Sequence, residues 1–180
     1  MTKSKSTGAY VLRLTLTLFL ITTVVAGLLG LVNYMTADTI ARQIAQKAEN
    51  AMRQVLEADG YEPLDIPEGS AVTAAYRAGE KGYVVRVAPN GFGGAIDMMV
   101  GVDLNGAVTG VAIVSQSETA SLGANCTRED FRAQFTGKTG SLSVSKDGGE
   151  IEALTGATVT SRAVTEGVNT ALEFVQEVLK

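Results

Sequence analysis

The 180-residue chain contains no histidine and a single cysteine. Without histidine there is no imidazole to act as a general base, to ligate a haem or to complete the usual histidine-containing zinc sites. The single cysteine, Cys126, excludes an internal disulfide and an iron–sulfur cluster held by four cysteines of one copy. Any redox chemistry on this chain therefore needs an organic cofactor or groups from other subunits. We interpret Cys126 itself as a small buried thiol.

Positive charge is also scarce, with 15 Lys and Arg against 19 Asp and Glu and a net charge of −4. No basic run follows the first residues, so the chain has no electrostatic footprint for nucleic acid, and we expect no nucleic-acid partner. Hydrophobic residues make up 46% of the chain, enough for both a buried core and a membrane segment. The length fits one modest domain plus an anchor.

A long uncharged segment lies near the amino terminus. Residues 14–37 carry no charged side chain, and their apolar core is long enough to cross a lipid bilayer as a helix. We predict a transmembrane helix over residues 14–35, in which each threonine hydroxyl bonds to a carbonyl one turn earlier. The alternative is a cleaved signal peptide, whose apolar region usually runs for only about 7–15 residues.

The charges that flank this segment bear on its orientation. Lys3, Lys5 and Arg13 precede it, and three basic residues follow it before residue 54, so the two sides are nearly equal by the positive-inside rule. Arg13 is adjacent to the span, and the free amino terminus lies on the same side. We therefore predict a cytoplasmic amino terminus, residues 1–13, and a domain outside the cytoplasm.

The remaining chain has the pattern of an α+β domain. Residues 36–58 have apolar positions at helical spacing and predict an amphipathic helix, and Gly60 to Ser70, with two prolines, predicts a linker; together residues 36–70 connect the anchor to the domain. Four strands are predicted, at residues 71–77, 83–88, 95–102 and 107–114. We expect a mainly antiparallel sheet in a domain of residues 71–180.

Several local signals refine this prediction. Asn105-Gly106 suits the positive φ angles of a tight hairpin turn. Thr127 resembles a helix N-cap, with Phe131 and Phe135 one turn apart after it. A short strand is predicted at residues 142–145, followed by a turn at residues 147–149. The last predicted helix, residues 161–179, has one apolar stripe, formed by Val164, Val168, Ala171, Leu172, Val175 and Leu179.

The segment that could carry chemistry directly precedes this last helix. Four hydroxyl residues surround Gly156 and Ala157, namely Thr155, Thr158, Thr160 and Ser161. Small side chains let a ligand approach the backbone, and the free N–H groups and dipole of a helix amino terminus favour a phosphate there. The residues alone leave two interpretations open: a phosphate site, or an ordinary helix cap with a tight connection.

Thr155-Gly156-Ala157-Thr158 resembles the [Ser/Thr]-Gly-Ala-Thr signature of the FMN-binding domain family, which the Rnf G subunit shares with the C subunit of the sodium-pumping NADH:quinone reductase. The resemblance implies that the Thr158 hydroxyl is joined to the phosphate of FMN, in a phosphoester made by a flavin transferase acting on FAD. It also implies that Thr160 and Ser161 lie at the cofactor together with Thr155, Gly156 and Ala157.

Two further segments resemble the same family. Residues 118–123 resemble its Glu-Thr-Pro-Gly-Leu-Gly loop, which implies that Glu118, Thr119, Leu122 and Gly123 lie near the flavin, and residues 91–96 resemble its Gly-Tyr-Gly-Gly segment. The departures are Ala120-Ser121 in place of Pro-Gly, Glu152 in place of the usual Asp, and Thr155 in place of the commoner Ser.

Similarity to the Rnf G subunit implies a single-pass protein of the inner (cytoplasmic) membrane, acting with other membrane and peripheral subunits. That complex transfers electrons between reduced ferredoxin and NAD⁺ and couples this transfer to Na⁺ or H⁺ export. The resemblance implies that this subunit relays electrons and is not catalytic alone. The chain has no Gly-x-Gly-x-x-Gly motif for NAD. Two alternatives are the usually longer quinone-reductase C subunit and a cofactor-free membrane-tethered scaffold in which Thr158 caps a helix.

Overall fold

The computed structural model describes residues 7–178. The chain divides after Ile44 into two compact units, which are described separately. Three residues used in the predictions above, Lys3, Lys5 and Leu179, lie outside the described residues.

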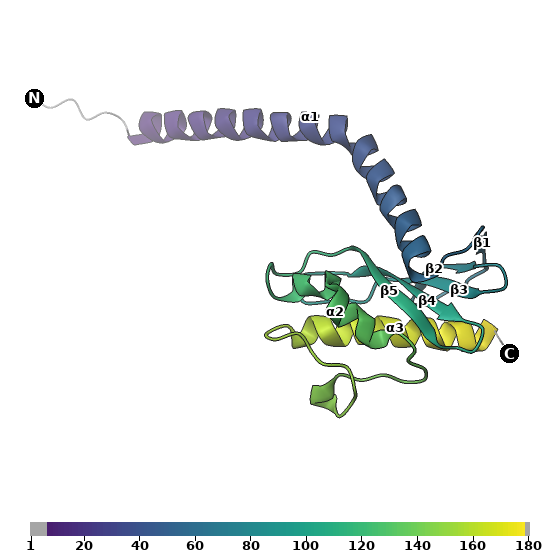
Figure 1. Ribbon diagram of the computed structural model, residues 1–180. Coiled ribbons are helices and arrows are strands. Elements are labelled where there is room, and N and C mark those ends of the chain that lie inside the picture. Colours follow the sequence, from purple (N-terminus) through teal and green to yellow (C-terminus); the bar gives the residue numbers. More distant parts are fainter. Residues whose placement is uncertain (1–6, 179–180) are drawn as a thin grey trace, which may run out of the picture. The chain divides into compact units, whose positions relative to one another are not determined.

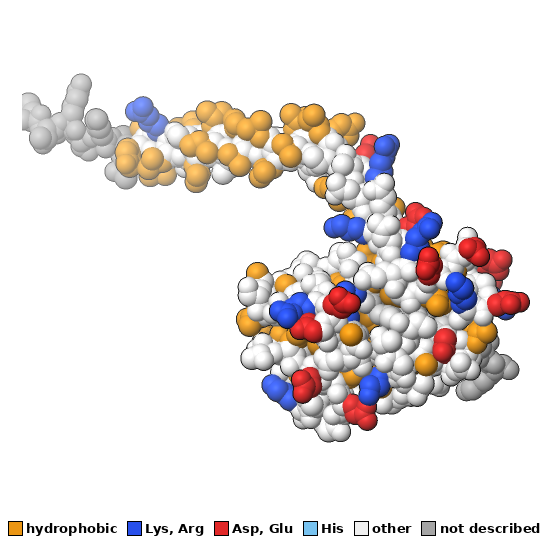
Figure 2. All heavy atoms as spheres, in the orientation of Figure 1, with side chains coloured by type: hydrophobic (Ala, Val, Ile, Leu, Met, Phe, Trp, Pro, Cys, Tyr) orange, Lys and Arg blue, Asp and Glu red, His pale blue; other side chains and the backbone are white. Residues whose placement is uncertain are grey.

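The first unit is one helix that continues into the second unit, α1 (Thr7–Val55). The large apolar side chains between residues 10 and 44 are exposed, as Figure 2 shows in orange, and the helix is long and apolar enough to cross a membrane. Its threonine hydroxyls donate to carbonyls one turn earlier at 2.8–3.0 Å, as predicted, for Thr15, Thr17, Thr22 and Thr23. The predicted span at residues 14–35 and the predicted amphipathic helix are parts of this one helix.

The second unit is built on a five-stranded antiparallel sheet in the order β1-β2-β3-β4-β5 (Figure 1). The strands are β1 (Glu62–Pro63), β2 (Val72–Arg77), β3 (Gly82–Val87), β4 (Asp97–Asp103) and β5 (Val108–Ser115). The α+β fold class and the four predicted strands are confirmed, each within two residues of its predicted bounds. The predicted linker, Gly60 to Ser70, contains a short strand that the prediction lacked. This strand is the two-residue β1, which pairs with β2.

Helices cover both faces of the central strands. α3 (Thr158–Val178) lies along one face, with the predicted stripe buried at Val164, Val168, Ala171, Leu172 and Val175 (Figure 1). The end of α1 covers the other face, where Ala51 and Val55 are buried with Met99. Side chains alternate along a strand, so β4 sends Met98 and Val100 to the α3 side. β4 is therefore apolar on both faces.

Two neighbouring glycines let α1 approach the sheet closely. Gly101 and Gly110 are opposite each other in β4 and β5, and a Cβ on Gly101 would lie 2.6 Å from the Val55 carbonyl oxygen. The Thr109 hydroxyl donates a hydrogen bond of 2.6 Å to the same oxygen. Ile40 and Ile44, two apolar residues of the predicted amphipathic helix at residues 36–58, are exposed, and full burial begins at Ala51.

The turn between β4 and β5 differs in detail from the prediction. Gly106 has a φ of 79°, but among the described non-glycine residues only Ser121 has a positive φ, so Asn105 does not. The Asp103 carboxylate takes over part of the turn, because its Oδ1 accepts the N–H groups of Asn105 and Ala107, both at 2.8 Å.

The segments between β5 and α3 are short helical turns: η1 (Gly123–Thr127), α2 (Glu129–Arg132), η2 (Ala133–Phe135) and η3 (Ser145–Asp147). The predicted N-cap at Thr127 is wrong, because its hydroxyl donates instead to the Ala124 carbonyl at 2.9 Å. Phe131 and Phe135 do meet, edge to face with ring centroids 5.7 Å apart. The strand predicted at residues 142–145 is also wrong, since this segment forms only one isolated bridge, between Val144 and Ile151.

Candidate functional site

Three segments that are far apart in the sequence surround one cavity of about 370 Å³. They are the loop before β4, the loop after β5 and the start of α3. This volume is in the range of small-molecule sites. The lining residues are Phe92, Glu118, Thr119, Leu122, Gly123, Gly156, Ala157, Thr158, Val159 and Thr160. The structure therefore brings together eight of the ten residues that the sequence nominated.

Glu118 connects the three segments. It is only 8% exposed, and its Oε1 accepts the backbone N–H of Gly93 at 2.7 Å. Its Oε2 accepts the hydroxyl of Thr160 in the first turn of α3. Hydrogen bonds to an ionised carboxylate are stronger than those between neutral groups. Glu118 thus holds the loop before β4 and the start of α3 against its own loop.

Glycines make this convergence possible. A Cβ on Gly91 would lie 2.4 Å from Glu118 Oε1, and one on Gly123 would lie 2.5 Å from Glu118 Oε2. A Cβ on Gly93 would lie 2.2 Å from the carbonyl oxygen of Ser117. A Cβ at Gly93 would force the Ser117 backbone to move, and a Cβ at Gly91 or Gly123 would displace the Glu118 carboxylate from its hydrogen-bond partners.

Ser121 occupies a strained position in the loop after β5. Its φ of 63° is in the left-handed region, where a residue with a Cβ costs roughly 1–2 kcal/mol. This is the position at which the resembled family has glycine. The Asn125 side-chain amide supports the strained backbone by donating to the Ser121 carbonyl at 2.9 Å. The loop therefore keeps a glycine-like shape although it lacks the glycine.

α3 begins at Thr158, three residues before the predicted start. The Ser161 N–H makes a helical bond to the Ala157 carbonyl at 3.0 Å, so the N–H groups of residues 158–160 precede the helix's own ladder. A turn of residues 154–157 precedes α3. In it the Ala157 N–H donates to the Leu154 carbonyl at 3.0 Å, and Gly156 has a φ of 75°. Positive φ at this position is typical of a type II turn.

Thr158 is one of the residues that line the cavity. The residue is half-buried, and its Oγ1 accepts a hydrogen bond of 2.9 Å from Lys146 Nζ. Thr158 is inside the first turn of α3, one residue after Ala157, whose carbonyl accepts the first helical bond. A role as the helix cap, which the scaffold interpretation requires, does not agree with this geometry.

Two nominated residues lie away from the cavity. Ser161 is fully buried and shapes the turn, because its Oγ accepts the Leu154 N–H and donates to the Ala157 carbonyl, both at 2.9 Å. Thr155 is exposed and lines a separate opening together with Glu152.

Three residues at the site were missed by the sequence analysis. Phe92 and Val159 line the cavity, and Lys146 contacts Thr158 from outside the lining set. Phe92 is 74% exposed in the structure, and its place between two glycines is the sequence signal that could have indicated it. Lys146 lies twelve residues before Thr158, in a segment without any motif, and no local pattern indicates it.

Cys126 is buried in the core next to the site. Burial raises the pKa of its thiol to about 11, and the negative charge of Glu118 acts in the same direction. The thiol is therefore neutral at physiological pH and is a poor nucleophile, which agrees with its interpretation as a packing residue.

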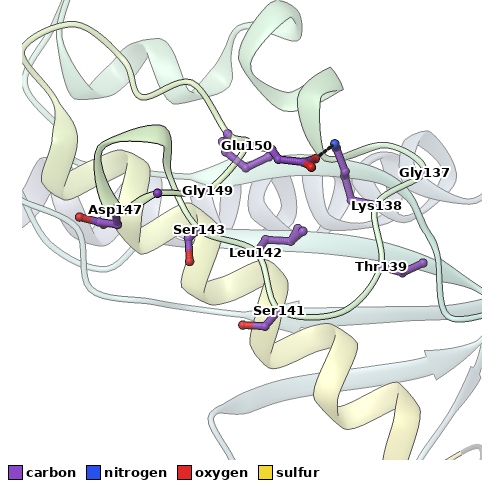
Figure 3. A pocket seen from close by; sticks show the side chains of 11 residues that line it. Gly137, Lys138, Thr139, Ser141, Leu142, Ser143, Asp147, Gly149 and Glu150 are labelled. Carbon is purple, nitrogen blue, oxygen red and sulfur yellow. Dashed lines mark hydrogen bonds and ion pairs between the residues drawn. The ribbon is translucent and has the colours of Figure 1, made fainter.

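A second cavity, of about 480 Å³, lies between the loops that precede α3 (Figure 3). Its walls are mostly polar loop residues between 137 and 151, and an ion pair between Lys138 and Glu150 bridges them. None of the nominated site residues lines this cavity.

Comparison with known proteins assigns both parts of the chain to known families. Residues 91–173 match the FMN-binding domain family, and residues 1–55 match the RnfG N-terminal region. The crystal structure of the C subunit of the Na⁺-translocating NADH-quinone reductase from Parabacteroides distasonis superimposes with a TM-score of 0.55 at 21% identity, over 75% of this chain and 83% of that one. This likeness establishes the shared fold.

Two relatives are similar over almost their whole length. The G subunit of the proton-translocating ferredoxin:NAD⁺ oxidoreductase complex of Clostridium ljungdahlii is 38% identical, over 90% of this chain and 88% of the relative. The G subunit of the Na⁺-translocating ferredoxin:NAD⁺ oxidoreductase complex of Acetobacterium woodii is 34% identical, over 94% of each chain. With both segments of the family matched in order, the chain belongs to the family of Rnf-complex G subunits.

Proposed function

We propose that this chain is the membrane-anchored electron-transfer subunit of a redox-driven, ion-translocating ferredoxin:NAD⁺ oxidoreductase complex, and that it carries FMN at the cavity formed by the three segments. The observation that carries this proposal is the convergence of the family's FMN-binding segments on one cavity beside a reachable hydroxyl, that of Thr158. The protein relays electrons and catalyses no reaction alone. Its partners are the other membrane and peripheral subunits of the complex.

The proposal includes a covalent link at Thr158. A flavin transferase uses FAD as donor; the bond from Thr158 Oγ to the flavin-side phosphorus forms, the phosphoanhydride bond breaks, AMP leaves, and the hydroxyl proton passes to the transferase. The half-buried position of Thr158 in the cavity wall supports this assignment. A tether keeps the flavin at a millimolar-scale effective concentration although the cavity is open.

The residues at the cavity suit the parts of FMN. The N–H groups of residues 158–160 and the positive end of the α3 dipole would hold the phosphate. Phe92, Leu122 and Val159 offer exposed apolar surface to the ring system. Bound FMN supplies one- and two-electron redox chemistry, which the side chains of this chain lack. Glu118 keeps the loops in place around it.

The same proposal assigns the parts of the chain to membrane compartments. Residues 1–13 lie in the cytoplasm, residues 14–35 cross the inner membrane, residues 36–70 connect, and the domain of residues 71–180 lies outside the cytoplasm. The exposed apolar side chains of α1 support contact with lipid or with membrane partners. The match of residues 1–55 to the RnfG N-terminal region favours the Rnf complex over the quinone reductase.

Loss of the Thr158 hydroxyl tests the attachment. Thr158→Val keeps a similar volume and removes the nucleophile, so we expect no flavin fluorescence in the denatured gel band after co-expression with a flavin transferase. Thr158→Ser should keep some of the fluorescence. Thr170→Val is the matched control, because its hydroxyl lies on the same helix and only bonds to the Glu166 carbonyl. Covalent flavin retained in Thr158→Val would move the attachment to another residue.

A further inference from the structure

Lys146 lies within the stretch that matches the FMN-binding family but outside its three short motif segments, and its amine contacts the proposed attachment point. Nζ donates a hydrogen bond of 2.9 Å to Thr158 Oγ1. This contact joins η3 to the first residue of α3, across twelve positions of the sequence. An ammonium group at this place would be within reach of a phosphate on the same oxygen.

The backbone that carries Lys146 is fixed independently of the lysine side chain. The Asp147 N–H bonds to the Val144 carbonyl at 2.8 Å, and the Ser145 N–H bonds to the Ile151 carbonyl at 2.7 Å. Gly148 follows with a φ of 83°, and a Cβ on Gly149 would lie 2.0 Å from the Ser143 carbonyl oxygen. The loop is thus a tight, internally bonded turn that presents residue 146 at a defined position.

A second contact attaches this loop to α3. The Asp147 carboxylate accepts two hydrogen bonds from the Arg162 guanidinium, at 2.7 and 2.6 Å. Arg162 is one helical turn after Thr158, so the ion pair lies directly beside the Lys146 contact. Because Asp147 and Arg162 already hold the loop to the helix, Lys146 is not needed to hold it there.

We propose that Lys146 binds the flavin phosphate: its ammonium pairs with the phosphate carried by Thr158 Oγ. This inference rests on the proposed function. The phosphodiester keeps one negative charge, and the cavity already contains the Glu118 carboxylate. The neighbouring cations Arg162 and Lys138 are engaged by Asp147 and Glu150, whereas Lys146 directs its amine at the hydroxyl that becomes the ester oxygen.

The pairing has a consequence for the attachment reaction. While the Thr158 oxygen attacks phosphorus, negative charge grows on the phosphate oxygens beside the Lys146 ammonium. The lysine therefore stabilises the transition state more than it stabilises the state before attack, in which Thr158 carries a free hydroxyl. Lys146 is exposed, and solvent weakens the interaction. We therefore expect about a tenfold slower attachment without the amine, which is the lower end for a hydrogen bond to a charged group.

The experiment uses the full-length chain in detergent with purified flavin transferase and FAD, and follows covalent flavin by in-gel fluorescence over time. Lys146→Met should reduce the rate about tenfold, and Lys146→Arg should restore it to within about threefold, because a guanidinium also pairs with phosphate. Lys138→Met is the matched control, a lysine on the adjacent loop whose partner is Glu150 (Figure 3), and it should react at the wild-type rate.

A second readout separates phosphate pairing from a general effect on the loop. In fully loaded protein, the phosphorus NMR resonance of Lys146→Met should differ from that of the wild type, and the resonance of Lys138→Met should coincide with it. Wild-type rate and resonance in Lys146→Met would overturn the inference, and so would an equal loss of rate in Lys146→Met and Lys146→Arg. Absence of covalent flavin in the wild type itself would instead refute the proposed function.

Discussion

Replacement of Glu118 by alanine tests whether this carboxylate assembles the site. The change removes the acceptor of two hydrogen bonds, from the Gly93 N–H and the Thr160 hydroxyl. A hydrogen bond to a charged group contributes about 1.5–3 kcal/mol, and water that enters the cavity would recover part of the loss. We therefore expect the free energy of unfolding to fall by about 2–4 kcal/mol, a decrease of roughly 5–15 °C in the melting temperature of the domain.

Glu118→Gln separates the shape of the side chain from its charge. The glutamine oxygen can accept the Gly93 N–H, and its amide can donate to the Thr160 oxygen, so we expect a loss of only about 0.5–1.5 kcal/mol. Near-ultraviolet circular dichroism of the full chain in detergent follows the tyrosines of the domain during thermal unfolding. Glu150→Ala is the control, because this carboxylate is 76% exposed and its replacement should leave the melting temperature close to that of the wild type. Equal melting temperatures for Glu118→Ala and Glu150→Ala would refute the assembling role.

Three further predictions follow from single residues. Ser121→Gly should raise the free energy of unfolding by about 0.5–1 kcal/mol in denaturant titrations, since glycine adopts the φ of 63° without strain; a loss of stability would contradict the left-handed assignment. Cys126 should react with iodoacetamide far more slowly in native than in unfolded protein at pH 8. Because its folded pKa of about 11 lies above the ordinary 9.0, the stability from its neutral thiol is complete below pH 9 and is lost as the pH rises through 11; rapid native labelling at pH 8 would be inconsistent with burial. Residue 80 is exposed between β2 and β3, so in Glu80→Cys the new thiol should be labelled by a membrane-impermeant maleimide in intact cells whose outer layer is permeable to the reagent. Labelling only after lysis would place the domain in the cytoplasm.

The strands could be predicted because their signals are local. Alternating apolar residues and glycine turns specify each strand, and the buried run of β4 reflects helices on both of its faces. The prediction separated α1 into a membrane span and an amphipathic helix. The hydropathy pattern could not show that the two are continuous, because hydropathy reports the surroundings of a helix and not its continuity. No proline or glycine interrupts residues 31–55, so the backbone remains helical where the composition changes.

The site shows the same limit. The resemblance identified eight residues of the cavity, but spacing did not distinguish the hydroxyl residues that line it from Ser161, whose hydroxyl shapes the turn before α3. Thr127 has a typical capping residue type and still bonds to the nearby Ala124 carbonyl, because local competition decides such contacts. Lys146 reaches Thr158 only through the folding of an intervening loop, and a contact of this kind has no sequence signature.

The most direct measurement of the central claim is the mass of the peptide that contains Thr158, isolated from membranes in which the chain was made together with its flavin transferase. We predict a peptide heavier by one FMN minus one water, with the added mass on the Thr158 side chain. A peptide of unmodified mass, from protein that shows no flavin absorbance, would contradict the claim.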